Sequence, residues 1–524
     1  MPRVLLRQGL ASAFAAALLT ALPAWGQADP TTSSTDRQFA ALLERLNRHR
    51  DGLERSARLI SLEEALEQGV QTNPVLRRAY AQIEEADWTL VGIQREWWPS
   101  LKADNDDPGL LGWTTTNSQE QVRSASGASQ NLVVQSGQAS VPRLHLQWTF
   151  FDPSRASRSQ AALAQISARR FLFQVEAREL VLQIQQAYYA LQEAFELQHD
   201  YKRIYAAVNH LVETGRGAHI DRGQRQQLLT QRLGLLILRI RTHERVIQAA
   251  DALAQAISLT PGQLAMPADR LEVQGRWDTP LQETITEALR LREEIQVSLS
   301  RAGADSWSAR ARQQRYLPSL FLGGQLSNQN QTLTSGSLLG PSQPTTTWDQ
   351  EIETQVGLGF DWTLFDGGIL SAEAEVLRSR ARQSLAQAEL DRLSVTRQVQ
   401  DNHASLINSE IIVQAAADQV QVARQSMQAA GEAYLANRGD ATRAVQASNA
   451  YRDAAEAYRG AVRKHNTSVA ALYRHSARWP EGIQPLLKRA FPRLAAPPQP
   501  AAPTAQPQAP KAAAVSPPGP ADAP

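Results

Sequence analysis

The sequence of this 524-residue chain contains two similar halves, and this internal duplication limits its possible folds more than any other feature. Three residues recur in the second half with the same spacing: Leu62, Glu64 and Trp88 match Leu281, Glu283 and Trp307. Two longer motifs follow in the same order, because residues 97–101 match 316–320 and residues 148–152 match 362–366. A tryptophan and two motifs in one order predict two structural repeats.

Each repeat has the same predicted order of elements. A helical segment (residues 62–97 and 281–316) runs into a Pro-Ser-Leu motif, where proline disfavours helix in the residue before it. A first strand is weakly patterned in residues 101–106 and better in residues 320–326. A loop rich in Gly, Ser, Thr, Asn and Gln follows (residues 107–140 and 328–350), then a second strand and a long helix.

The long helices are the most extended elements that the sequence predicts. Between Asp152 and Gly215 the only proline is Pro153, so about sixty residues can form a rod of roughly 90 Å. Gly- and Arg-rich segments at residues 214–217 and 437–440 predict turns after the two long helices. A second helix returns from each turn, with predicted ends near Leu259 and Trp479.

The second strand of each repeat alternates between apolar and polar residues. In residues 352–364 one face carries Ile352, Thr354, Val356, Leu358, Phe360, Trp362 and Leu364, and in the first repeat Leu144, Leu146, Trp148 and Phe150 alternate in the same way. Alternation of this length is typical of membrane barrel strands, which are apolar towards lipid and polar towards the lumen. The alternative is a half-buried strand in a soluble sandwich. Four strands cannot close a barrel alone, so the membrane interpretation requires several copies of the chain.

The N-terminus resembles a secretory signal peptide. Arg3 and Arg7 precede an apolar run from Leu10 to Leu22 that is too short to cross a bilayer, and small residues at Gly26 and Ala28 offer cleavage sites. A buried N-terminal helix is the alternative, but the run has no polar face. Beyond it, no apolar run reaches the eighteen or so residues of a membrane helix.

Composition and motifs argue against several classes of function. The whole chain has 54 basic and 52 acidic residues, so charge gives no support for a nucleic-acid partner. It has no cysteine, which excludes disulfides, thiolate metal sites and cysteine nucleophiles. No phosphate-binding loop, nucleophile elbow or zinc-protease motif is present. His199, His210 and His219 lie near one predicted turn, where a metal site is the alternative, but single histidines on solvated helix faces are more often only surface residues. We therefore predict no catalytic residues, no cofactor and no metal.

The duplicated motifs resemble the TolC-like outer membrane efflux protein (outer membrane factor) family. The matching residues are Leu62, Ala65 and Leu66 with Asn73-Pro74, the two Pro-Ser-Leu motifs, and residues 148–152 and 362–367. The resemblance covers roughly residues 59–479. It implies a mainly α-helical homotrimer in which each chain gives four strands to a twelve-stranded outer membrane barrel, continued by a periplasmic helical barrel.

The resemblance also implies function and partners. Such proteins dock to a periplasmic adaptor and an inner-membrane pump or ABC exporter, and they export drugs, metals or polypeptides without doing chemistry. The implied adaptor-contacting tips are Arg216, Gly217, Arg438, Gly439 and Asp440, and the implied aperture residues are Arg443, Val445, Gln446 and Ser448. Acidic residues are expected at such an aperture, and their absence here argues against a cation-selective gate.

These observations predict five segments and one leading function. The segments are a signal peptide (1–26), an N-terminal periplasmic segment (27–58), a first repeat (59–275), a second repeat (276–480) and a disordered Pro/Ala-rich tail (481–524). The leading function is an outer-membrane channel subunit of a tripartite efflux or type I secretion system. A soluble periplasmic coiled-coil adaptor or structural protein is the alternative.

Overall fold

The computed structural model describes residues 57–105, 112–124, 127–214, 222–260, 262–337 and 345–494, with scattered helical positions between 41 and 55. The chain divides into two units, Met1–Arg58 and Leu59–Pro524. In the first unit Arg48 lies 3.8 Å from Glu44, one helical turn earlier. The predicted signal peptide lies outside the described residues. Everything below concerns the second unit.

The helices of the two repeats correspond one to one. The first repeat contains α3 (Leu62–Thr72), α4 (Pro74–Arg95), α5 (Arg155–Thr214) and α6 (Arg222–Ala256). The second contains α7 (Leu281–Leu291), α8 (Glu293–Gln314), α9 (Ile369–Leu435) and α10 (Ala441–His475). Corresponding helices have 11, 22 and 35 residues in both repeats, and only the long rods α5 and α9 differ, with 60 and 67. The repeated sequence therefore folds as a repeated structure.

The predicted helical segments at residues 62–97 and 281–316 are each divided into two helices. Asn73 separates α3 from α4 with an extended backbone, and its side chain accepts a hydrogen bond from the Val75 amide at 2.8 Å. The Asn73 amide group also donates to the Ala256 carbonyl at 2.9 Å. Pro74 occupies the first helical position, where its missing N–H costs nothing. Arg292 separates α7 from α8 at the corresponding place.

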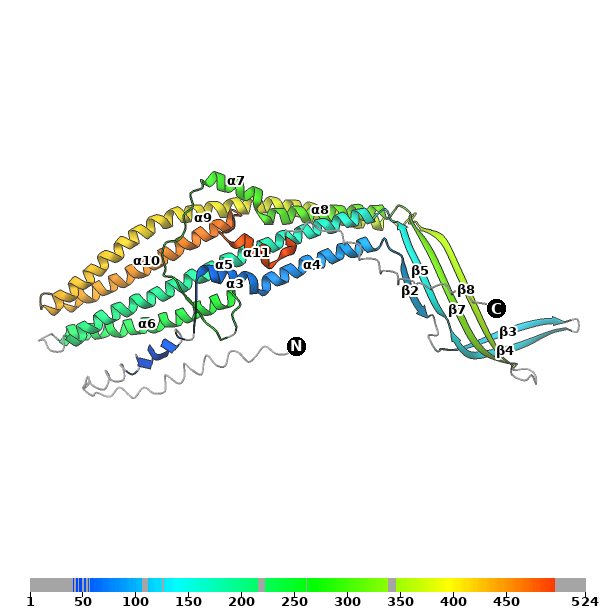
Figure 1. Cartoon of the computed structure of the whole chain (residues 1–524), viewed down its shortest axis with the longest axis horizontal. Coiled ribbons are helices and arrows are strands. Elements are labelled where there is room, and N and C mark those ends of the chain that lie inside the picture. The colour runs from blue at the N-terminus through cyan, green and yellow to red at the C-terminus, as the bar shows by residue number, and fades with distance from the viewer. Residues whose placement is uncertain are drawn as a thin grey trace, which may run out of the picture. The chain divides into compact units, whose positions relative to one another are not determined.

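The helices pack around the two rods. Helix α5 contacts α4, α6, α8 and α10, while α9 contacts α8 and α10 (Figure 1). Close approach depends on small residues. A Cβ atom on Gly69 of α3 would lie 2.3 Å from Ile184 Cδ1 of α5, so a larger residue there would require the Ile184 side chain to shift.

The sheet contains six strand segments: β2 (Ser100–Asn105), β3 (Gly112–Ser124), β4 (Gly127–Ser140), β5 (Pro142–Phe151), β7 (Ser319–Ser337) and β8 (Thr345–Asp361). Strand β2 pairs with β5, and β3 with β4, which makes one interrupted antiparallel hairpin. Both β4 and β5 pair with β7 in one continuous register, since Ser140 faces Asn330 and Arg143 faces Ser327. Strand β8 pairs with the other side of β7. Segments β2 and β3 thus correspond to one long strand and β4 and β5 to another, and together with β7 and β8 they make the four predicted strands.

Two predictions about irregular segments are wrong. Most residues of the predicted polar loops at 107–140 and 328–350 belong instead to β3, β4, β7 and β8. The hydrogen bonds between strands join backbone groups, so segments rich in Thr, Ser and Gln can also form strands. The predicted disordered tail begins with an ordered piece, α11 (Ile483–Ala490) and a short 3₁₀ turn (Pro492–Leu494). Phe491 is buried there, with its ring centroid 5.2 Å from that of Tyr80 and 4.9 Å from that of Phe173.

A small two-stranded sheet joins β1 (Arg58–Ile60) to β6 (Ala265–Pro267). Tyr188 of α5 donates a hydrogen bond to the Ile60 carbonyl at 3.2 Å. Among the described residues, no helix is both long enough and apolar enough to cross a membrane.

Candidate functional site

The four-stranded sheet has two chemically different faces. Residues directly opposite each other in neighbouring strands lie on the same face of a sheet. Trp148 faces Leu322, which faces Leu358, so these three side chains share a face. The predicted lipid-facing residues within the strands all fall on this face: Leu144, Leu146, Trp148, Val356, Leu358 and Phe360.

This apolar face is exposed. Val356, Leu358 and Phe360 are 74%, 78% and 68% exposed, and Trp362, directly after β8, is 50% exposed. A large exposed apolar patch marks a surface that something else covers. The six residues within the strands thus share one face of the sheet, and their contact with lipid stays a prediction.

The opposite face of the sheet is polar and hollowed. Asp104 lies 3.3 Å from both Lys102 and His145, and Gln147 and Gln355 border the same hollow of about 720 Å³. Phe321 is an aromatic residue on this polar face. Its ring lies against Gly359, where an added Cβ atom would be 2.4 Å from the ring, so glycine makes room for it.

The junction between helices and strands is held by the same hydrogen bonds in both repeats. The Trp148 indole donates to the Trp97 carbonyl at 2.8 Å, and the Trp362 indole donates to the Tyr316 carbonyl at 2.9 Å. These tryptophans therefore fasten the end of one strand to the end of the preceding helix. This bond explains why Trp148 of the first repeat recurs as Trp362 in the second.

An aspartate lies three residues before each long helix. Asp152 accepts a hydrogen bond from the Ser154 amide, and Asp366 accepts one from the Gly368 amide, both at 2.8 Å. Burial raises the pKa of Asp152, but the bonds from Ser154 and the charge of Arg158 outweigh it and lower the pKa below its ordinary value. Both carboxylates are thus fixed as charged caps at the exits from the sheet.

A cluster of buried charges lies where α7 meets α8. Arg178 of α5 forms a 2.8 Å ion pair with Glu293, each side chain being 5% exposed, and its guanidinium lies 4.0 Å from the Trp479 ring. Arg292 and Arg474 both bind Glu294, at 2.8 and 2.7 Å. Burial would raise the pKa of Glu294, but these two arginines lower it to about 2. The cluster ties α5, α8 and α10 together.

Comparison with solved structures gives one consistent result. An outer membrane channel of Campylobacter jejuni, CmeC, superposes with a TM-score of 0.62 at 14% identity, over 82% of this chain and 89% of that one. The open-state MtrE channel of Neisseria gonorrhoeae gives 0.58 at 19% identity, over 80% and 89%. The outer membrane protein VceC of Vibrio cholerae gives 0.59 at 15% identity, over 80% and 96%.

The chain has the outer membrane factor fold. No protein-family model matches the sequence, and neither does any curated protein. The similarity therefore lies in the arrangement of helices and strands, at identities too low to carry residue roles across.

One of the two predicted adaptor-contacting tips of this fold lies within the described residues. Arg438 and Asp440 are exposed between α9 and α10, and Asp440 caps α10 by accepting a bond from the Arg443 amide at 2.9 Å. The left-handed residue of this turn is Asn437, with φ 56°. Gly439 packs closely in the turn, since an added Cβ would lie 3.3 Å from Ala433 Cβ. Arg216 and Gly217 lie outside the described residues.

The four predicted aperture residues do not share one environment. Arg443 and Gln446 are exposed. Val445 packs against a buried cluster that includes Leu228 and Tyr434. Ser448 is 1% exposed and accepts a hydrogen bond from Gln231 of α6 at 3.0 Å, so its hydroxyl lies between helices. The role of these four residues at an aperture stays a prediction.

Sequence reasoning missed the buried charge cluster, because isolated Arg and Glu residues on a helix resemble surface charges. The one available signal was the double charge Glu293-Glu294 directly after a helix break. Within the described ranges, no three His, Asp or Glu side chains gather as a metal ion would require, and His219 lies outside those ranges.

Proposed function

We propose that the chain is the subunit of an outer membrane export channel, in which three copies close one twelve-stranded barrel and continue it as a helical duct in the periplasm. The observation that carries this proposal is the two-faced sheet, with an exposed apolar face opposite a hollowed polar one. Lipid covers the first face and the duct runs along the second.

The edges of the sheet support closure by further copies. Among the described strands, β8 pairs with β7 alone, and β2 and β3 each pair with a single strand. Strand direction alternates across the sheet, so β8 of one copy meets β2 and β3 of the next in antiparallel order. Three copies supply twelve strands and leave no open edge.

The helices support the same assembly. Leu393, Ile411 and Val422 of α9 are 70%, 66% and 61% exposed, and Ile237 of α6 is 52% exposed. Such a series of apolar side chains along a rod is covered when a neighbouring copy packs against it. A soluble monomeric spacer, the alternative function, would leave both this series and the apolar sheet face in water.

The channel does no chemistry of its own in this proposal. Its substrates pass through the lumen, and the turn between α9 and α10, with its partner turn between α5 and α6, binds a periplasmic adaptor and through it an inner-membrane pump or ABC exporter. Drugs, metal ions and polypeptides remain the candidate cargo classes.

The test is to extract the full chain from bacterial outer membranes and reconstitute it in planar lipid bilayers. We expect an oligomer of three chains that dissociates on heating, and discrete current steps in KCl. Recovery of the chain as a monomer in the soluble periplasmic fraction, without conductance, would refute the proposal.

A further inference from the structure

The two hairpins of the sheet have the same register. Strand β2 pairs with β5 so that Ser100 faces Gln147, and β7 pairs with β8 so that Ser319 faces Asp361. A shift of 219 residues takes Ser100 to Ser319, and a shift of 214 takes Gln147 to Asp361. The same two shifts convert every other pair of β2 with β5 into a pair of β7 with β8. Each of these positions in one repeat therefore has a counterpart at the same place in the other.

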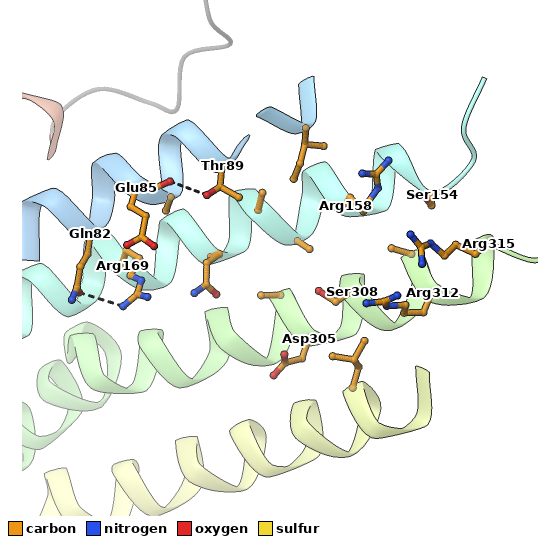
Figure 2. Close-up of a pocket in the computed structure, with 18 residues that line it drawn as sticks. Gln82, Glu85, Thr89, Ser154, Arg158, Arg169, Asp305, Ser308, Arg312 and Arg315 are labelled. Carbon is orange, nitrogen blue, oxygen red and sulfur yellow. Dashed lines mark hydrogen bonds between the residues drawn. The ribbon is translucent and has the colours of Figure 1, made fainter. Parts of the chain in front are cut away.

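The contact between the repeats shows how one hairpin joins the next. Strand β5 ends the first repeat's part of the sheet and pairs with β7, so that Gln147 faces Gly323 and Trp148 faces Leu322. The helices follow the same order, because α5 contacts α4 and α8, and α8 contacts α9. Figure 2 shows these helices side by side, with a recess of about 550 Å³ among α4, α5 and α8. Strand β2 and helix α4 thus lie at one side of this row, and β8 and α9 at the other.

Strand β8 ends earlier than its counterpart β5. Strand β5 continues to Phe151, and beyond Gln147 it pairs with β7 and not with β2. Strand β8 ends at Asp361, the counterpart of Gln147, and residues 362–365 are not in a strand. The last residues of β5 therefore owe their strand structure to the neighbouring repeat. Within the described chain, β8 has no such neighbour on its outer side.

Two exposed charges lie at matching heights on the outer helices α4 and α9. The same shifts take the first residue of α4 to that of α8, and the first residue of α5 to that of α9. The 2.8 Å ion pair of Arg178 on α5 with Glu293 on α8 puts these two residues at one height. The positions three residues nearer the sheet correspond to Glu389 on α9 and Arg77 on α4. Both side chains are exposed, and among the described residues neither has an ion-pair partner.

We propose that α9 and the end of β8 in one copy bind α4 and β2 of the next copy in the register that joins the two repeats within the chain. The inference rests on the proposed function, because it specifies how the copies of the channel meet. A head-to-tail contact repeated in this way closes a ring of six repeats from three copies. It places Asp361 opposite Asp104 of the next copy, extends β8 into residues 362–365, and brings Glu389 to Arg77 of the next copy.

This register puts two carboxylates opposite each other, an arrangement that would be destabilising if neither charge were compensated. Asp104 lies 3.3 Å from both Lys102 and His145 of its own copy. Lys102 would in turn lie opposite Thr363, two residues from Asp361. A cation of the next copy therefore stands beside both carboxylates.

Disulfide cross-linking tests the strand register, since the chain has no cysteine of its own. Strands β5 and β7 separate β2 from β8 within one copy, so a disulfide between β2 and β8 joins two copies. We expect D104C/D361C to give covalent trimers when outer membranes are oxidised. The matched controls D104C/T363C and D104C/G357C move the second cysteine by two and four residues on the same face. They should give little product, because their Cα atoms would be more than about 7 Å apart.

A charge exchange tests the helix contact without any cysteine. R77E and E389R each bring like charges together, and each should lower the temperature at which the trimer dissociates in detergent. R77E/E389R restores a pair of opposite charges and should recover most of the loss. The matched control R95E/E389R reverses the same two kinds of charge, but its glutamate lies at the other end of α4, so it should keep the defect.

The outcomes separate the register from the channel function. If the wild type gives neither trimers nor current steps, the channel function fails. If it gives both, but D104C/T363C or D104C/G357C cross-links in place of D104C/D361C, the channel stands and the proposed strand register is refuted. A defect of R77E that persists in R77E/E389R would overturn the contact of α9 with α4.

Discussion

At the scale of single residues, Gly359 leaves room for the Phe321 ring on the polar face of the sheet. We expect Gly359→Ala to lower the free energy of unfolding by about 1–3 kcal/mol, because the new methyl group would overlap the Phe321 ring. Gly357→Ala is the matched control on the same strand, since nothing lies within 4 Å of its added Cβ.

Thermal unfolding in detergent measures both variants. Phe321→Ala in the Gly359→Ala background should recover part of the loss, because the overlapping ring is gone. Equal destabilisation by the two glycine substitutions would show that the contact is not the cause.

The buried charge cluster makes a prediction about pH. Burial, together with the charges of Arg292 and Arg474, lowers the pKa of His475 to about 4, from an ordinary value of 6.5. Between these two values the unfolded chain binds a proton that the folded chain does not. The stabilising contribution of neutral His475 is therefore complete above pH 6.5 and is lost as the pH falls towards 4.

Thermal unfolding of the wild type at several pH values between 7 and 4 tests this. His475→Gln keeps an acceptor for Arg292, which lies 3.2 Å from His475 Nδ1, and cannot be protonated. The melting temperature of this variant should fall less steeply with pH in that window. An identical slope in the two proteins would exclude His475 as the titrating group.

At the scale of elements, β8 is the strand whose orientation carries the proposed function. We expect Leu358→Arg to reduce the yield of assembled protein in membranes, at a cost of roughly 2–4 kcal/mol for a charge at the bilayer midplane. Gln355→Arg, on the polar face of the same strand, should assemble normally. The heat-sensitive oligomer recovered from membranes is the quantity to compare. Tolerance of arginine at both positions would contradict a lipid-covered face.

Elements specified by burial of an apolar face could be predicted from the sequence, whereas polar strands held by backbone hydrogen bonds could not. Alternation of apolar residues in β5 and β8 is a local pattern set by burial of one face, so it was visible in the sequence. The extension of β7 into residues 328–337 and the existence of β3 and β4 were missed, because these polar segments are held by ladder hydrogen bonds that leave no apolar pattern. Helix α11 was missed because its two buried residues, Ile483 and Leu487, and the buried Phe491 after it adjoin a Pro/Ala-rich tail.

Only part of the candidate site could be predicted from the sequence. The apolar face of the sheet could, since its predicted members belong to the alternating series of β5 and β8. The recess of about 550 Å³ among α4, α5 and α8 could not be predicted, because its lining residues come from different repeats and are brought together only when α5 packs against α8. Only the tertiary packing shows which charges remain unpaired.

At the scale of the whole molecule, two kinds of surface in the described chain have no packing partner: the outer edges of the sheet and the exposed apolar side chains along α9. Further copies placed side by side would cover both. Leu393 and Ile411 of α9 are largely exposed in a single copy. In the proposed channel, assembly therefore covers the α9 series and closes the edges of the sheet.

This leads to a prediction about assembly that does not depend on lipid. Leu393→Glu would bury an unpaired charge where a neighbouring copy packs on α9, which costs several kcal/mol and should weaken association by about a hundredfold or more. Gln383→Glu adds the same charge at an exposed polar position of the same helix and should have little effect. Native mass spectrometry in detergent gives the ratio of oligomer to monomer, and circular dichroism checks that the monomer keeps its helices. Unchanged assembly of Leu393→Glu would mean that this face of α9 stays in water, and that the copies meet through the strands alone.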